Sequence, residues 1–155
     1  MRPRVVLGFS GGVDSAVTAK LLTMQGWDVY CVYLETGSGE GEYAHESAER
    51  MGLPFKLIDA RAALEREVCE PFEAAYLAGA TPSPCVLCNR RVKLKLLCGA
   101  ADALGIERIA TGHYAAARAG ALFRGRPEND QSYMLCLVSR DQARRLVLPL
   151  GGYVK

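Results

Sequence analysis

The stretch VVLGFSGGVDS, residues 5–15, places an apolar run directly before a polar loop that contains two adjacent glycines. Residues 5–9 are apolar and begin with two valines, which is typical of a strand buried on both faces. Beyond the loop, Ala16–Gln25 carries apolar residues on one helical face, and Gly26 is a natural C-cap. A strand, a tight turn and a helix in this order predict the first unit of a parallel α/β sheet.

Strand-like and helix-like segments continue to alternate along the chain. We predict further strands at 29–34, 55–59 and 108–111, and helices at 45–51, 61–77 and 90–104. Near the end we predict a hairpin of 115–118 and 122–124, a strand at 133–138, and a helix at 141–147 with Ser139 as a candidate N-cap. The alternation predicts one α/β domain over residues 1–155, with a parallel sheet and helices on both faces. Ligands of such sheets bind beyond the carboxyl ends of the strands.

The composition fits one compact core and excludes several classes of protein. Half of the 155 residues are hydrophobic, but no apolar run approaches the ~20 residues of a membrane span, and no secretory signal is recognisable. We therefore expect a cytoplasmic protein with no membrane partner. Residues 1–78 carry 7 Lys or Arg and 12 Asp or Glu, whereas residues 79–155 carry 12 and 5. We therefore expect any polyanionic partner to bind the second half, which carries the excess of positive charge.

The glycine loop has the properties of a phosphate site. Gly11 and Gly12 allow a tight turn whose N–H groups face an anion, and the following helix directs its positive end to the same place. A Walker-type loop would carry a lysine, which this loop lacks. Asp14 would repel phosphate unless it binds a cation, and a Mg²⁺ ion bridging Asp14 and pyrophosphate would resolve this conflict.

Motifs along nearly the whole chain are similar to those of one family. The loop SGGVDS, residues 10–15, resembles the PP-loop of ATP pyrophosphatases. With TPSPCVLCNRRVK (81–93), ATGHYA (110–115) and DQSYML (130–135), in this order, the chain resembles the bacterial tRNA-specific 2-thiouridylases. The resemblance implies a Rossmann-like, adenine nucleotide α-hydrolase-like domain. It also implies that ATP adenylates a base carbonyl of tRNA, that pyrophosphate leaves, and that a cysteine persulfide delivers sulfur. A loop that holds a leaving pyrophosphate would need no Walker lysine.

The same resemblance implies roles for individual residues. ATP would contact Gly8, Phe9, Ser10, Gly11, Gly12, Val13, Asp14, Ser15, Leu34 and Gly112. The target base would contact Ser83, Pro84 and Cys85, and the rest of the tRNA would contact His113, Asn129, Asp130 and Gln131. Two positions depart from the family pattern, because Cys85 replaces an aspartate and Asn129 replaces a lysine. Cys88 matches the first catalytic cysteine, and its position near a basic helix start predicts a lowered thiol pKa.

The Cys85-x-x-Cys88 pair allows three interpretations. Cys88 could carry a persulfide that Cys85 resolves as a disulfide. The pair could instead hold a [4Fe–4S] cluster with a third ligand, for which Cys98 or Cys136 is available. Zinc is the weaker alternative, because His45 and His113 lie far apart in the sequence. Cys31 and Cys98 lie on apolar segments and are expected in the core.

The sequence therefore favours ATP-dependent tRNA thiolation, with ATP and Mg²⁺ as cofactors. The basic residues Arg90, Arg91, Lys93, Arg124 and Arg126 would face tRNA phosphates. Alternatives are an adenylating sulfurtransferase for a small metabolite, a [4Fe–4S]-dependent thiolation enzyme, and a non-catalytic nucleotide-binding subunit. The family continues into a second catalytic cysteine, a linking domain and a β-barrel, so we expect a short form or a fragment. Besides tRNA, we consider three further partners: a sulfur-donor protein, a separate partner chain, or a second copy in a homodimer.

Overall fold

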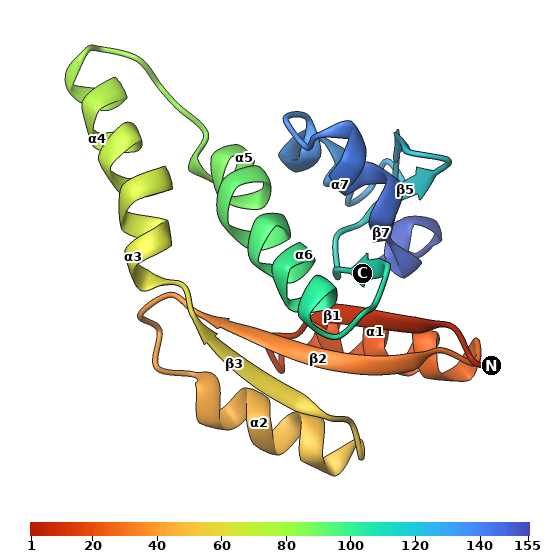
Figure 1. Cartoon of the computed structure of the whole chain (residues 1–155). Coiled ribbons are helices and arrows are strands. Elements are labelled where there is room, and N and C mark those ends of the chain that lie inside the picture. The colour runs from red at the N-terminus through yellow and green to blue at the C-terminus, as the bar shows by residue number, and fades with distance from the viewer.

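A computed structural model describes all residues, 1–155, and its centre is one parallel sheet (Figure 1). The strands, in spatial order, are β3 (Phe55–Asp59), β2 (Asp28–Glu35), β1 (Arg4–Gly8), β4 (Arg108–Ala110) and β7 (Leu146–Val147). Every neighbouring pair is parallel. The chain moves from β1 outward to β3 and then returns to the other side of β1. The strand order therefore reverses beside β1, which is where open α/β sheets bind ligands.

Alternate residues of β1 build a separate core on each face of the sheet. Val5 and Leu7 pack with Leu22 of α1 (Val13–Met24), in a cluster that includes Ala48 of α2 (Gly41–Arg50). Val6 packs on the other face, in the cluster formed by α6 (Leu94–Ala103). Each fully buried side chain of this size contributes about 1.5–3 kcal/mol relative to exposure. The predicted parallel sheet with helices on both faces is confirmed.

Two long helical segments lie side by side and project from the sheet (Figure 1). The first runs without a break through α3 (Arg61–Leu64), the π-turn η1 (Glu65–Cys69) and α4 (Glu70–Leu77). The second runs through α5 (Pro84–Cys88), the π-turn η2 (Asn89–Lys93) and α6. The predicted helix at 61–77 is confirmed. The helix predicted to begin at residue 90 begins at Pro84, because proline is favoured in the first turn and Ser83 before it is extended.

The last third of the chain departs most from the predicted elements. The hairpin β5 (Ala115–Arg118) and β6 (Ala121–Arg124) is antiparallel, as expected. Residues 133–138 do not form the predicted strand, because a 3₁₀ turn, η3 (Ser132–Leu135), occupies this segment. Asp130 fixes that turn by accepting hydrogen bonds from the backbone N–H and the hydroxyl of Ser132.

The predicted helix at 141–147 is shorter than expected. It forms α7 (Arg140–Arg145), with Ser139 in a capping box, and Leu146 and Val147 leave it to pair with β4. A second 3₁₀ turn, η4 (Pro149–Gly152), follows. None of these helices has the length and apolar character needed to cross a membrane.

Candidate functional site

A pocket of about 350 Å³ lies at the carboxyl ends of β1 and β2, where the strand order reverses. Seven residues predicted to contact ATP line it: Gly8, Phe9, Ser10, Asp14, Ser15, Leu34 and Gly112. Two residues predicted to contact tRNA, His113 and Gln131, line the same pocket. The loop residues Gly11, Gly12 and Val13 lie beside it and do not form its wall. The size is within the range of small-ligand pockets.

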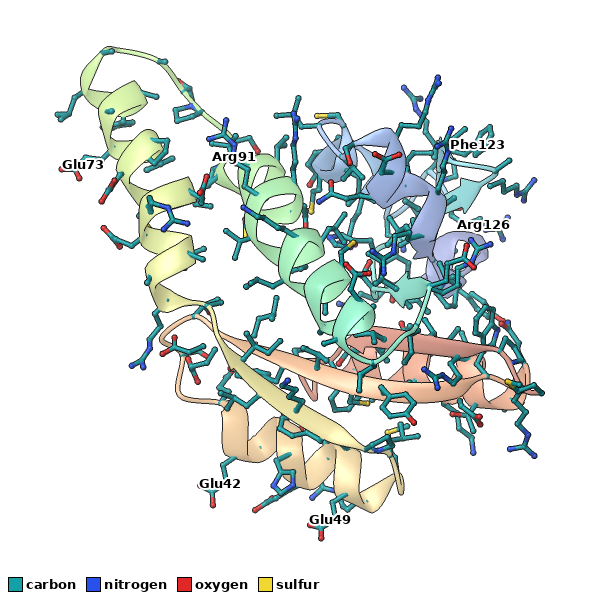
Figure 2. The ribbon with its side chains drawn as sticks, in the orientation of Figure 1. Glu42, Glu49, Glu73, Arg91, Phe123 and Arg126 are labelled. Atoms are coloured by element: carbon teal, nitrogen blue, oxygen red, sulfur yellow. The ribbon has the colours of Figure 1, made fainter.

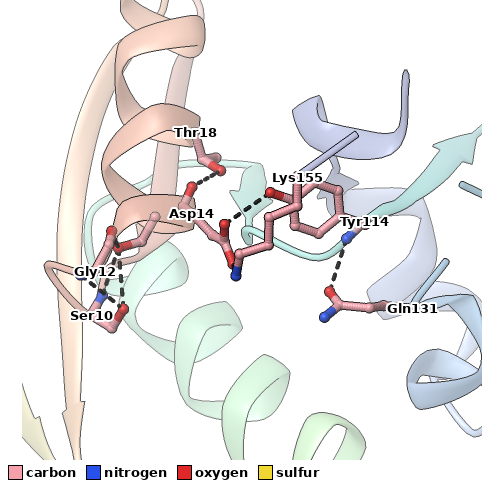
Figure 3. Close-up of polar contacts among 8 residues, drawn as sticks. Ser10, Gly12, Asp14, Thr18, Tyr114, Gln131 and Lys155 are labelled. Atoms are coloured by element: carbon pink, nitrogen blue, oxygen red, sulfur yellow. Dashed lines mark hydrogen bonds and ion pairs between the residues drawn. The ribbon is translucent and has the colours of Figure 1, made fainter. Parts of the chain in front are cut away.

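The polar groups of the loop hold the loop itself in shape (Figure 3). The Ser15 hydroxyl donates to the Gly12 carbonyl at 3.0 Å and accepts from the Ser10 backbone N–H at 3.2 Å. The backbone of Gly11 has φ +78°, and a Cβ there would lie 2.9 Å from the Cα of Ala44 in α2. Glycine is required at this position because α2 approaches the loop closely and the backbone is left-handed.

Asp14 joins the loop to two residues that are distant in sequence, Tyr114 and Lys155 (Figure 3). Tyr114 Oη donates to Asp14 Oδ1 at 2.9 Å, and Lys155 Nζ donates to Asp14 Oδ2 at 2.8 Å. Burial would raise the pKa of the Asp14 carboxyl, but these hydrogen bonds and the Lys155 charge lower it overall. Asp14 is therefore an ionised carboxylate in the pocket wall.

The chemistry of Asp14 fits a magnesium–nucleotide complex. Mg²⁺ usually takes one or two carboxylates and completes its ligands with waters and substrate phosphates, so a single aspartate in a phosphate pocket is sufficient. Such an ion would compete with Lys155 for Oδ2. Residue 112 packs closely against the backbone of Asp14. Glycine permits this close packing, because a Cβ at position 112 would lie 3.3–3.4 Å from backbone atoms of Asp14.

His113 is buried and neutral. Its Nδ1 lies 2.7 Å from the Thr111 hydroxyl, within hydrogen-bond distance. Burial, with the nearby Lys93 charge, lowers the pKa of the imidazole to about 4. Gln131 is held next to it, because its side-chain oxygen accepts from the Tyr114 backbone N–H at 3.0 Å. His113 therefore contributes a neutral imidazole to the wall of this pocket.

The other predicted tRNA residues lie outside this pocket. Ser83 is the N-cap residue of α5, and Pro84 begins the helix. Asp130 accepts hydrogen bonds from the Gly125 and Ser132 backbones, so its carboxylate organises a turn. The polar side-chain atoms of Asn129 are buried and lack any hydrogen-bond partner.

Cys88 lies at the end of α5 and is half-buried against a small cluster that contains Val68 and Val92. Burial raises the pKa of its thiol, and the neighbouring thiols Cys85 and Cys69 also raise it. The charge and backbone N–H of Lys93 act in the opposite direction, but the net pKa is raised. The predicted lowering of this pKa is therefore wrong. The helix begins at Pro84, so Cys88 does not lie at its positive end.

The cysteines do not form a ligand set for a metal. No group of three or more His, Cys, Asp or Glu side chains is close enough together to hold an ion. His45 of α2 packs against Phe55 of β3, with ring centroids 5.1 Å apart. Cys98 and Cys136, predicted as third ligands, do not join Cys85 and Cys88 in such a group. The structure thus shows no metal site at these residues, and the [4Fe–4S] and zinc interpretations stay predictions. The thiol-exchange interpretation stays a prediction too, and exposed Cys85 lies one turn from Cys88.

The basic residues after Cys88 separate into two groups. Arg90, Arg91 and Lys95 line a second, wholly polar pocket of about 420 Å³, together with Glu67, Ser139 and Gln142. None of these three cations takes part in an ion pair. Figure 2 shows Arg91 and Arg126 on the upper part of the molecule, while Glu42 and Glu49 extend from α2 at the opposite end. Lys93, which was expected to face tRNA with them, lines the nucleotide-loop pocket instead.

Sequence reasoning missed several residues of the site. Lys93 and Met134 line the main pocket, Tyr114 and Lys155 bind Asp14, and Cys69 is a third thiol near Cys88. Lys93 carried a recognisable signal, since it follows Cys88 by five residues on one helix. Tyr114 and Met134 lie within the motifs ATGHYA and DQSYML, which indicated the site without indicating these residues. Cys69 and Lys155 come from other segments, and nothing in their local sequence indicates this location.

The chain is similar to curated proteins over nearly its whole length. The tRNA-specific 2-thiouridylase MnmA of Sorangium cellulosum is 43% identical over 171 residues, covering 98% of this chain and 44% of that protein. The corresponding enzyme of Azorhizobium caulinodans is 42% identical over 172 residues, with coverages of 98% and 44%. The chain thus spans about half the length of the curated relatives it matches.

A solved structure shares the fold. The crystal structure described as a predicted subunit of tRNA methyltransferase from Methanocaldococcus jannaschii superposes with a TM-score of 0.61 at 20% identity. The match covers 98% of this chain and 70% of that one. The model of the tRNA methyl transferase HUP domain matches residues 3–155, which is nearly the whole sequence. This chain therefore belongs to the tRNA methyl transferase HUP domain family.

Proposed function

We propose that the chain is the nucleotide-binding domain of an ATP-dependent tRNA-thiolating enzyme of the 2-thiouridylase type. One observation carries the proposal: the lysine-free loop, Leu34 and Gly112 line a single pocket. Cys88 lies on the helical segment that also contributes to the wall of this pocket. The similarity to 2-thiouridylases over the whole chain supports the same function. The unpaired cations Arg90, Arg91 and Lys95 support a polyanionic partner.

The chemistry assigns separate tasks to the residues. The loop N–H groups and the start of α1 would bind the phosphates of ATP, and Asp14 would hold the accompanying Mg²⁺, which would offset phosphate charge. A carbonyl oxygen of the tRNA base attacks the α-phosphorus, so the base is adenylated and pyrophosphate leaves. The neutral imidazole of His113 adds no charge to this step.

Sulfur transfer follows at Cys88. A sulfur-donor protein first converts the thiol to a persulfide, whose terminal sulfur attacks the adenylated carbon and displaces AMP. The thiolate of Cys85 then attacks the Cys88 Sγ, breaks the sulfur–sulfur bond and leaves the thiocarbonyl on the base. The products are a Cys85–Cys88 disulfide and thiolated tRNA, and a dithiol reductant restores both thiols.

The test is pyrophosphate release by the purified chain with ATP, Mg²⁺ and bulk tRNA. We expect release that depends on tRNA, strong loss in Asp14→Asn, and retention in Cys88→Ala, which removes only the later sulfur transfer. Absence of both ATP binding and release would contradict the proposal. Release without tRNA dependence would instead favour a small-metabolite acceptor, an alternative that the replacement of the base-contacting aspartate by Cys85 supports.

Sulfur transfer is tested separately. With a persulfide-loaded sulfur-donor protein as the sulfur source, thiolated nucleosides in digested tRNA are measured by mass spectrometry. Thiolation that survives Cys88→Ala would show that Cys88 does not carry the sulfur. ATP binding without pyrophosphate release under any condition would favour a non-catalytic nucleotide-binding subunit.

A further inference from the structure

Lys93 lies between the nucleotide-loop pocket and Cys88. It lines the nucleotide-loop pocket together with Gly8, Ser10 and Ser15, and it contacts Cys88 through its backbone N–H. Its side chain is half-buried, and no ion pair of the structure includes it. A partly buried ammonium without an anionic partner is unfavourable, and a phosphate in this pocket would supply the partner.

The π-turn explains why Lys93 lies close to Cys88 and apart from its basic neighbours. In a regular α-helix, a residue five positions on is rotated by about 140° from the first, since one turn takes 3.6 residues. Across η2 the backbone instead bonds from residue i to i+5, which brings the two positions nearer to one helical face. Arg90, Arg91 and Lys95 line the separate polar pocket. The π-turn thus occurs at the point where Lys93 lines one pocket and the other three cations line another.

The charge of Lys93 acts on both neighbouring sites. It lowers the pKa of the Cys88 thiol, against the larger effect of burial, and it adds to burial in lowering the pKa of His113. Lys93 is therefore the cation whose field reaches the thiol and the pocket together. The loop itself offers no lysine to a phosphate, and Lys155 is already paired with Asp14.

We propose that Lys93 supplies, from a distant segment, the cation that the loop lacks, and that it links nucleotide occupancy to the reactivity of Cys88. Its ammonium group binds phosphate oxygens in the pocket, and when the pocket is empty the same group stabilises the Cys88 thiolate. The departure of pyrophosphate thereby returns the positive charge to the thiol. Lys93 is a binding residue toward the nucleotide and a positioning residue toward Cys88. This inference rests on the proposed nucleotide function of the pocket.

The nucleotide half is tested by measuring ATP and pyrophosphate binding to the whole chain by calorimetry. Lys93→Met removes the charge and keeps the length of the side chain, and we expect about tenfold weaker binding of both ligands, as for the loss of one charge-assisted hydrogen bond. Lys93→Arg should retain most of the affinity. The matched control is Lys20→Met, at an exposed lysine of α1 that lines neither pocket, which should bind like the unmodified chain.

The thiol half is tested by the pH dependence of Cys88 alkylation with iodoacetamide. Cys85 and Cys136 are first replaced by serine, and peptide mass spectrometry reports the Cys88 site alone. We expect Lys93→Met to slow alkylation at pH 8 by about threefold to tenfold by moving the profile to higher pH, while Lys20→Met leaves it unchanged. Pyrophosphate should move the profile in the same direction in the unmodified chain and have no effect in Lys93→Met.

The outcomes separate this inference from the function on which it rests. If the unmodified chain binds neither ATP nor pyrophosphate, the proposed function fails and the inference fails with it. If it binds both and Lys93→Met binds them equally well, only the inference is overturned. Weaker binding with an unchanged alkylation profile overturns the link between the two sites. Circular dichroism and the urea midpoint of each variant establish that the comparison is between folded proteins.

Discussion

At the scale of single residues, Gly11 is the position where the loop is most constrained. We expect Gly11→Ala to reduce the free energy of unfolding by about 1–3 kcal/mol, because φ is +78° and the new Cβ would lie 2.9 Å from Ala44 Cα. The matched control is Gly12→Ala, where φ is −71° and the Cβ would lie 3.5 Å from Ser10 Oγ. That change should stay within about 0.5 kcal/mol. Urea denaturation measures both, and equal effects would contradict the argument.

His113 gives the chain a predictable response to acid. Its folded pKa of about 4 lies below the ordinary value of 6.5, so the unfolded chain binds more protons between these two pH values. Stability is then fully present above pH 6.5 and is lost as the pH falls toward 4. We expect this group to lower the free energy of unfolding by about 2 kcal/mol between pH 7 and pH 5.

The measurement is urea denaturation at both pH values, together with an NMR titration of the His113 ring. In His113→Asn the corresponding part of the pH dependence should disappear. A titration midpoint near 6.5 in the folded protein would show that the imidazole is not buried in the way described.

At the scale of elements, the capping box of α7 has a consequence that can be measured. The Ser139 hydroxyl accepts from the Gln142 backbone N–H, and the Gln142 side chain accepts from the Ser139 backbone N–H and donates to the Arg90 carbonyl. Ser139→Ala should cost about 1 kcal/mol of stability, and Ser139→Thr should restore most of it. Thermal denaturation of the three proteins gives the comparison. Equal loss in both variants would indicate that packing, not capping, matters there.

The elements also show where prediction from sequence succeeds and fails. The strands at residues 5–9 and 29–34 were predictable because each is a continuous apolar run, and a buried parallel strand needs no other local signal. The strand at 55–59 contains Lys56 and Asp59 and is a partly exposed edge strand, so its place between two helical segments was the stronger signal. The segment 133–138 is equally apolar. It begins in a 3₁₀ turn instead, because Asp130 accepts hydrogen bonds from Ser132 at the start of that turn. The short strand β7 was hidden within a predicted helix, since two residues gain strand geometry only by pairing with β4.

At the scale of the whole molecule, Arg145 fastens the last elements to the helix that carries the thiols. Its Nε donates to the Glu107 carbonyl at 2.8 Å, and its terminal nitrogen lies 2.8 Å from the Asp102 carboxylate. We expect Arg145→Ala to destabilise the chain by about 1–3 kcal/mol, because backbone carbonyls lose their donors. Arg144→Ala is the control, since that side chain is 61% exposed and pairs only with exposed Asp141.

Urea denaturation of the two arginine variants decides this point. The exposed pair should contribute no more than about 0.5 kcal/mol, so a comparable loss in both variants would contradict the assignment. Limited proteolysis is a second measurement. In Arg145→Ala we expect earlier cleavage after residue 139, where α7 would detach from the sheet.

The sequence by itself determined the α/β class, the phosphate loop and the thiol pair, because apolar period, glycine spacing and the Cys-x-x-Cys are local patterns. It could not determine which residues from distant segments meet at the loop. Only the tertiary structure decided that Lys93 reaches the pocket, that Tyr114 and Lys155 hold Asp14, and that burial raises the pKa of Cys88. These properties depend on through-space distance and desolvation, which arise only when the segments pack together.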